Sequence, residues 1–249
     1  MAFTDWDTSF YKGGSQGWVG GDDASQQINS ALSSPLTLNG NDARKFKSVT
    51  GNNGDKIAAS YRLDATLYPE FTAIPDTKAV SVRAWVRVEA EASSSDTMLV
   101  GIAVKAGGVA PTLPGGYLLV IGRGAAFALN QATGLTMAFI DQTPIVREEY
   151  NSLYAVAADT WYQIRLDVIP TLNGAIVDRD TIRAYINTGS EATPVWTLLR
   201  EEIVQNVDAA WIPWGDATRT RVGFVFEGRR WGVERTAWID GFEAKLKNR

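Results

Sequence analysis

Tryptophan and arginine side chains toward the C-terminal end are the groups best suited to hold a ligand. Trp211 and Trp214 flank Pro213 in a segment with the composition of a loop. Exposed indole faces serve as stacking platforms for sugars and as anchors of protein interfaces. The same two rings would also fit as apolar packing at one end of the folded domain. The sequence leaves both interpretations open.

A second group combines positive charge with an indole, because Arg229 and Arg230 stand directly before Trp231. Three further arginines complete the group: Arg219, Arg221 and Arg235. Such a group suits phosphate, an acidic glycan or an acidic partner subunit. Glu227 and Glu234 lie among these arginines, so a solvated, salt-bridged surface is the competing interpretation.

Catalytic chemistry is limited by two absences, since the chain has 0 histidines and 0 cysteines. Ser-His-Asp triads and histidine-containing metal sites are therefore excluded, as are disulfides, thiolate metal sites and cysteine nucleophiles. Catalysis would need carboxylates, lysine, tyrosine or a metal bound by oxygen atoms. We assign no catalytic residue.

Local acidic clusters occur at Asp22-Asp23 and at Asp178-Arg179-Asp180. Carboxylate oxygens suit Ca²⁺, but neither cluster matches a specific calcium-loop pattern. Aspartate in turns more often caps backbone N–H groups. We therefore expect no cofactor and no metal site, with calcium at these clusters as the alternative.

Composition and charge describe an ordinary globular protein with 45% hydrophobic and 21% charged residues. The net charge of −4 disfavours long-range attraction to nucleic acid or to an anionic membrane surface. No run of about 18 apolar residues, the length of a transmembrane helix, occurs, and no signal peptide is recognisable at the start. We expect neither nucleic acid nor a membrane as a partner.

Apolar residues recur mostly with a period of two, which predicts half-buried antiparallel strands. Four segments show it most clearly, with valine, isoleucine, leucine, alanine or phenylalanine at alternate positions: 79–90, 161–169, 181–187 and 221–227. Six further strands are predicted at 56–63, 97–105, 117–122, 125–129, 136–141 and 195–199. The apolar runs 98–104 and 117–121 indicate central strands covered on both faces. Many short strands separated by Gly, Asn and Pro turns predict an all-β sandwich.

The last predicted strand breaks the alternation, because Ile239 and Phe242 cannot both face inward in a regular strand. A β-bulge at Asp240-Gly241 would place both inside, and glycine is the residue that tolerates the required backbone.

The first 40 residues differ from the rest. Glycines surround Trp18 after an aromatic-rich start, and residues 22–32 have the pattern of a short helix. We expect residues 1–40 to form an N-terminal arm with a short helix, and residues 41–249 to form the sandwich domain. The arm either docks on a neighbouring subunit or packs on its own sandwich as an edge strand.

Residues 159–168 and 181–187, with their Trp161-Tyr162 and Tyr185-Ile186-Asn187 motifs, resemble a hairpin of the concanavalin A-like lectin/glucanase superfamily, in particular its laminin-G-like members. The segments Val222–Phe224 and Ile239–Phe242 resemble the end of the same fold. The resemblance covers roughly the last hundred residues and implies an antiparallel jelly roll of two stacked sheets. It also implies a carbohydrate or protein site on the concave sheet or at its rim. The superfamily contains enzymes and pure binders alike.

Retaining glucanases of this superfamily carry alternating acidic residues on one strand, where two carboxylates share a face. The pairs Glu89/Glu91, Asp5/Asp7 and Asp178/Asp180 begin such a pattern, and none completes it. The adjacent pairs Glu148-Glu149 and Glu201-Glu202 would point to opposite faces of a strand. We therefore expect a protein that is not an enzyme, with glycoside hydrolase activity as the disfavoured alternative.

Two non-enzymatic functions follow. The first is a structural or assembly protein, with a tailed-bacteriophage virion component (capsid decoration or tail/baseplate-associated) as the expected form. Its partners would be further virion subunits or copies of itself, and its location the virion after synthesis in the host cytoplasm. The alternative is a lectin-like carbohydrate-binding module, cytoplasmic or extracellular, that uses Trp211, Trp214 or Trp231.

Overall fold

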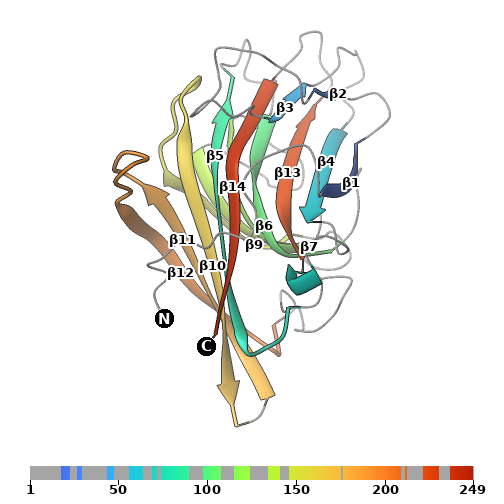
Figure 1. Ribbon diagram of the computed structural model, residues 1–249, viewed down its shortest axis with the longest axis vertical. Helices are drawn as coiled ribbons and strands as arrows, with labels where there is room; N and C mark the ends of the chain where they lie inside the picture. Colours follow the sequence, from blue (N-terminus) through green and yellow to red (C-terminus); the bar gives the residue numbers. More distant parts are fainter. Residues whose placement is uncertain are drawn as a thin grey trace.

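The computed structural model consists of two stacked antiparallel sheets of seven strands each (Figure 1). It describes residues 18–22, 27–29, 44–47, 56–63, 69–71, 74–89, 98–107, 115–123, 134–140, 146–174, 176–208, 211, 221–229 and 236–248. The β-sandwich predicted from the sequence is thereby confirmed. Among the described residues, no helix has the length and apolar character needed to cross a membrane.

Sheet A has the strand order β1-β4-β13-β6-β7-β8-β9. Its strands are β1 (Trp18–Asp22), β4 (Lys56–Leu63), β6 (Met98–Gly107), β7 (Gly115–Arg123), β8 (Gly134–Ile140), β9 (Val146–Tyr154) and β13 (Arg221–Arg229). A single 3-10 turn, η1 (Pro69–Phe71), lies between β4 and the next strand.

Sheet B has the strand order β12-β11-β10-β5-β14-β3-β2. Its strands are β2 (Gln27–Asn29), β3 (Arg44–Lys47), β5 (Lys78–Val88), β10 (Tyr162–Asn173), β11 (Ile176–Asn187), β12 (Trp196–Gln205) and β14 (Thr236–Asn248). The chain crosses between the sheets several times: β4, β5 and β6 belong to A, B and A in turn, whereas β6 to β9 all lie in A and β10 to β12 all lie in B.

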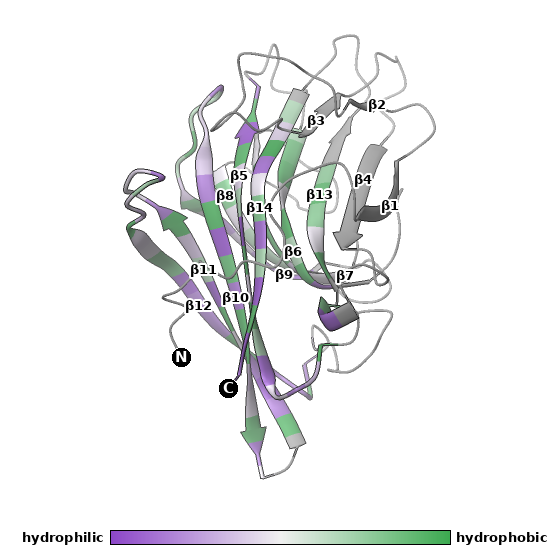
Figure 2. Ribbon diagram, in the orientation of Figure 1, coloured by the Kyte–Doolittle hydropathy of each residue, from purple (hydrophilic) through white to green (hydrophobic). Residues whose placement is uncertain are grey.

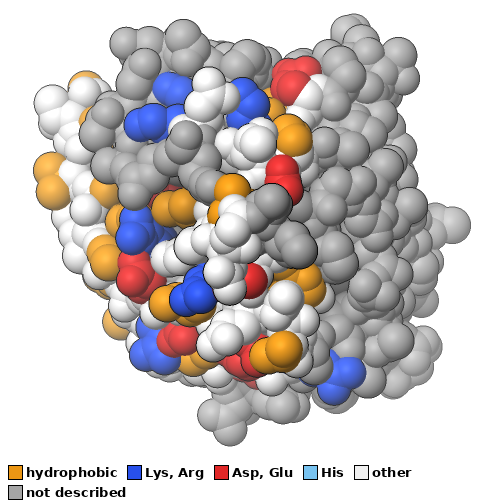
Figure 3. Space-filling view, turned by 90° about the horizontal axis from the view of Figure 1, so that it is seen from below, with side chains coloured by type: hydrophobic (Ala, Val, Ile, Leu, Met, Phe, Trp, Pro, Cys, Tyr) orange, Lys and Arg blue, Asp and Glu red, His pale blue; other side chains and the backbone are white. Residues whose placement is uncertain are grey.

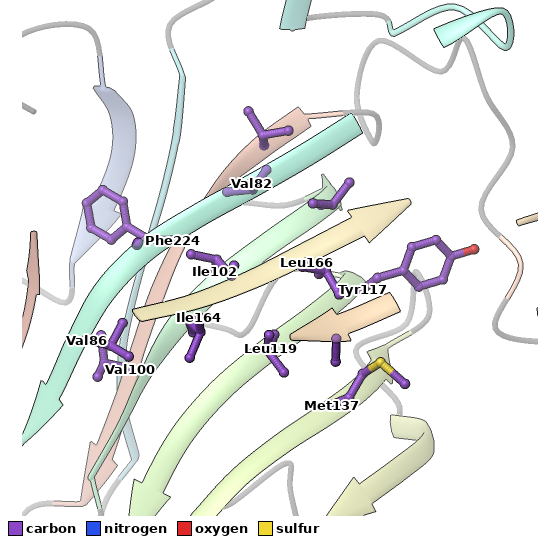
Figure 4. Packing of buried hydrophobic residues seen from close by; sticks show 14 of the residues in the cluster. Val82, Val86, Val100, Ile102, Tyr117, Leu119, Met137, Ile164, Leu166 and Phe224 are labelled. Atoms are coloured by element: carbon purple, nitrogen blue, oxygen red, sulfur yellow. The ribbon is translucent and has the colours of Figure 1, made fainter. Parts of the chain in front are cut away.

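The main core fills the space between the two sheets. The side chains predicted to face inward from β5, β10, β11 and β13 are buried there, apart from the partly buried Tyr162. Val82, Leu166 and Phe224 illustrate this packing (Figure 4). Figure 2 shows the resulting alternation of hydrophobic and hydrophilic residues along the strands of sheet B. Sheet B is therefore apolar toward the core and polar on its outer face.

The central strands of sheet A are apolar on both faces, as the uninterrupted runs in β6 and β7 predicted. Its inner face contributes residues such as Ile102 and Leu119 to the main core. Its outer face contributes a second buried cluster: Leu99, Ala103, Leu118, Val120, Ala138, Ile140 and Val225. Strands buried on both faces read as continuous hydrophobic segments.

The bulge predicted in the last strand is present. The register between β14 and β5 shifts between Asp240 and Glu243, and Gly241 has a φ of 54°. Ile239 and Phe242 are both buried in the main core as a result.

The helix predicted over residues 22–32 is contradicted at residues 27–29, which form β2 and pair with β3. A helix of this length is marginal in water, and pairing with a neighbouring strand satisfies the same backbone groups. Residues 18–22, within the predicted arm, form β1 and pair with β4 of the same chain. Residues 1–17 and the strand predicted at 125–129 lie outside the described residues.

Substituting Gly241 tests the bulge. Gly241→Ala should lower the free energy of unfolding by about 1–2 kcal/mol, because a residue with a Cβ strains at this φ. The new Cβ would also lie 3.1 Å from Cδ1 of Trp85. Gly174→Ala is the matched control, since Gly174 has a φ of 67° and no atom lies within 4 Å of the position that a Cβ would take there. Urea denaturation should show the larger loss for Gly241→Ala; equal losses would contradict the contact with Trp85.

Candidate functional site

The outer edge of sheet B is formed by β12, which pairs with β11 on one side and has no strand neighbour on the other among the described residues. In Figure 1 it lies at the left margin of the molecule. An edge strand presents unpaired N–H and C=O groups that can pair with a strand of another chain. Its side chains therefore decide whether this edge is protected or available.

Exposed large hydrophobic side chains concentrate along β12 and its flanks. Leu198 is 48% exposed and Ile203 is 51% exposed, and the flanking Val195 and Val207 are 58% and 83% exposed. Figure 3 shows hydrophobic side chains along its left margin, the side on which Figure 1 places β12. Apolar groups gathered beside an open edge mark a site of protein contact.

The charged residues in the middle of β12 are already paired within the chain. Nε of Arg183 lies 2.5 Å from Oε2 of Glu201 on the outer face. On the inner face Arg200 pairs with Glu202. The two adjacent glutamates thus point to opposite faces, as predicted. Lysine and proline commonly protect an edge strand, and β12 contains neither residue.

The facing edge of sheet A differs. Strand β9 is irregular, with register shifts against β8 at two places and a positive φ of 56° at Ser152. It carries Arg147, Glu148 and Glu149 in succession. Two register shifts make this edge less regular than β12, and an irregular edge discourages the addition of a further strand.

A polar seam joins these two edges. The Arg200 guanidinium lies 4.4 Å from the centre of the Tyr150 ring, and the Tyr150 hydroxyl donates to Oε2 of Glu148 at 2.5 Å. Burial and the hydrogen bond to Glu148 raise the pKa of Tyr150. The Tyr150 phenol therefore stays protonated near neutral pH. Its contact with Arg200 holds β12 against β9.

Next to β12, the outer face of sheet B carries a stacked layer of rings around Arg165. Its guanidinium lies 4.8 Å from the Tyr185 ring centre and 5.6 Å from that of Trp196. Nη2 of Arg165 also contacts Oδ2 of Asp167 at 2.5 Å, and the Ser81 hydroxyl hydrogen-bonds the same carboxylate. Burial, followed by the charge of Asp167, raises the pKa of Tyr185.

A buried ionic cluster on the inner face of β11 links the two sheets. Nζ of Lys105 lies 2.6 Å from Oδ2 of Asp180, and the Tyr117 hydroxyl donates to the same oxygen at 2.8 Å. Both charged side chains are fully buried. Burial lowers the pKa of Lys105 to about 8, an effect that Asp180 opposes.

Trp211 belongs to this cluster. Its ring centre lies 4.6 Å from Nζ of Lys105, and the half-buried side chain packs against the main core. This is the position that the packing interpretation expects. Arg229 ends β13 and Trp18 begins β1, but their side chains are not among those described. Trp214, Arg230 and Trp231 lie outside the described residues, so the binding role of this set of residues stays a prediction.

The acidic residues considered as calcium ligands have protein partners where they are described. Asp180 contacts Lys105, and Asp178 pairs with Arg179, which lowers the pKa of Asp178. Among the described residues there is no group of three acidic, histidine or cysteine side chains able to hold a metal ion.

No protein-family model matches this chain, and no curated protein matches it in sequence. Solved structures do resemble it. A protein of unknown function from Shewanella oneidensis MR-1 superposes with a TM-score of 0.55 and 14% identity, over 94% of this chain and 80% of that one. Lectin II from Ulex europaeus superposes with a TM-score of 0.51 and 10% identity, over 98% and 100% of the two chains. The lectin UEA-II complexed with galactose gives 0.52 and 10% over the same shares.

These likenesses show the fold, a β-sandwich of the concanavalin A-like jelly-roll type that the sequence resemblance implied. At such low identity they concern the fold. The site must therefore be argued from this chain's own surface.

The buried ion pair can be tested by substitution. Lys105→Met should lower the free energy of unfolding by about 3–5 kcal/mol, because it leaves the Asp180 carboxylate buried without its cation. The double variant Lys105→Met/Asp180→Leu should recover most of this loss, since no uncompensated charge remains. Urea denaturation of the three proteins measures both effects. A double variant as unstable as the single one would show that the pair is not an isolated ionic contact.

Proposed function

We propose that this chain is a non-enzymatic assembly protein that holds a protein partner at the open edge strand β12. The observation that carries the proposal is the exposure of Leu198 and Ile203 beside an edge that has no strand neighbour among the described residues. Added strands gain backbone hydrogen bonds along the edge, and side chains beside it supply apolar contact.

The buried charges support a role without catalysis. Lys105 has a pKa of about 8, which would suit proton transfer near neutral pH. Its side chain is fully buried and bonded to Asp180, however, so a substrate does not reach it. The cluster instead holds β6 to β11, the strand on which β12 depends.

The sequence favoured one form of such an assembly, a bacteriophage virion. The edge strand supports the assembly role itself, and the particle that contains the chain stays a prediction.

Adding charge at the edge tests the proposal. The tagged chain, produced in its native source, should elute in a complex larger than the 27.1 kDa single chain. Leu198→Lys/Ile203→Lys should release it as a free, folded chain, because lysine at an edge opposes strand addition. Thr77→Lys/Ala155→Lys adds the same charge at two exposed positions outside β12 and should stay in the complex.

Size-exclusion chromatography with light scattering measures the mass, and far-UV circular dichroism checks folding. A β12 variant that remains in the complex would contradict the proposal, as would a wild-type chain that elutes as a single chain.

A carbohydrate-binding function is the second candidate, favoured by the ring layer around Arg165. Trp196 and Tyr185 present aromatic groups on the outer face of sheet B, and such groups stack on sugars. If this function holds, glycan addition should change tryptophan fluorescence, and Trp196→Ala should reduce the change at unaltered thermal stability. A glycan array without signal would remove this candidate and leave the assembly role untouched.

A further inference from the structure

A bulge in β12 brings its two exposed apolar side chains to the same face. Leu198 and Ile203 are an odd number of residues apart, so a regular strand would point them to opposite faces. The register shifts between Ala184 and Tyr185 of β11, and Leu199 is left without a partner. Leu198 therefore pairs with Tyr185 and Ile203 with Thr181, and both lie on the outer face.

In the same register, the residues of β12 are placed symmetrically on the two sides of Glu201. Counted along β11, Leu198 and Ile203 lie equally far from Glu201 on its two sides. Arg200 and Glu202 are its nearest positions on either side, opposite Ala184 and Ile182. At the strand ends, Trp196 and Gln205 are also equally distant from Glu201.

A two-fold axis perpendicular to the sheet at Glu201 would use this symmetry throughout. Under this axis the two copies of β12 are antiparallel. The outer faces of both copies of sheet B then lie on the same side of the joined sheet, as strand pairing requires. Leu198 would then lie opposite the partner's Ile203 on the outer face. On the inner face Arg200 would lie opposite the partner's Glu202, which adds a charge pair between the chains.

The centre of this arrangement carries its one repulsive contact. Glu201 would lie opposite the partner's Glu201, and like charges directly across a strand pair are unfavourable. Each glutamate is compensated by the Arg183 of its own chain, whose Nε lies 2.5 Å from the carboxylate. The contact therefore brings together two neutralised pairs rather than two bare charges.

We infer that the partner held at β12 is a second copy of this chain, and that two sandwiches join through β12 in the register centred on Glu201 to form one continuous sheet. This inference rests on the proposed function, since it names the partner for the same edge. Closed two-fold dimers are the commonest form of self-association, and they require a self-complementary surface of this kind.

The absence of cysteine from the chain allows a direct test of the register. Glu201→Cys places one thiol from each copy on the axis, where the two Cα atoms of a directly opposed pair lie about 4.5–5.5 Å apart. That separation is within the range of a disulfide. Mild oxidation of the purified variant should therefore give a covalent dimer on a non-reducing gel.

Ile203→Cys is the matched control on the same strand. Its thiol would lie opposite the partner's Leu198, and the two copies of residue 203 would be roughly 13 Å apart along the strands. It should remain monomeric on the gel under the same oxidation. Sedimentation velocity of the wild-type chain should show a dimer in both redox conditions.

Three results would overturn the inference: a wild-type chain that sediments as a monomer, a Glu201→Cys variant that stays uncrosslinked, or an Ile203→Cys variant that crosslinks as readily. The proposed function fails separately. A chain that is monomeric alone but leaves its native complex when Leu198 and Ile203 become lysine still uses β12, with a different partner.

Discussion

An open β-sheet must end, and each end leaves a row of backbone donors and acceptors without a strand to pair with. This constraint separates the two edges that lie on the same side of the sandwich. At β9 the register shifts twice and Ser152 has a positive φ, so further pairing is discouraged. At β12 the charges are matched within the chain and apolar side chains stand exposed. The proposed contact follows from this difference.

The core explains why sheet B, and not sheet A, offers the site. The central strands of sheet A are buried on both faces and have no side chain left for a partner. Sheet B is buried on both faces along β10 but has exposed side chains along its edge strand β12. Its edge is fixed in place from behind, because Asp180 on β11 contacts Lys105 of sheet A while Arg200 on β12 stacks on Tyr150. A rigid edge loses little freedom when a strand is added.

Periodicity predicted most of this architecture from the sequence. The inward residues of β5, β10, β11 and β13, the doubly buried β6 and β7, and the bulge at Gly241 all follow from side-chain alternation and from the backbone freedom of glycine. Side-chain alternation did not predict the strands correctly where strand pairing is irregular. Strand β9 has no clean period and was not predicted, and β12 was predicted to end at Leu199, where its bulge lies. The site was missed for the same reason, because the bulge hides the shared face of Leu198 and Ile203.

The buried polar contacts could not be predicted from the sequence. Asp180 was considered as a calcium ligand, and nothing in its neighbourhood along the chain points to Lys105 or Tyr117, which reach it from the other sheet. Trp211 was assigned to a binding loop or to packing, and the choice depends on the same long-range contact. Such pairs follow from the stacking of the sheets and not from local pattern.

The central claim, that β12 is an edge covered by another chain, is tested most directly by amide hydrogen exchange at low and high protein concentration. The account predicts that exchange within residues 196–205 slows as concentration rises, because the outward amides become hydrogen-bonded, while exchange within residues 146–154 does not change. Exchange in β12 that is independent of concentration, in a sample that contains dimers, would contradict it.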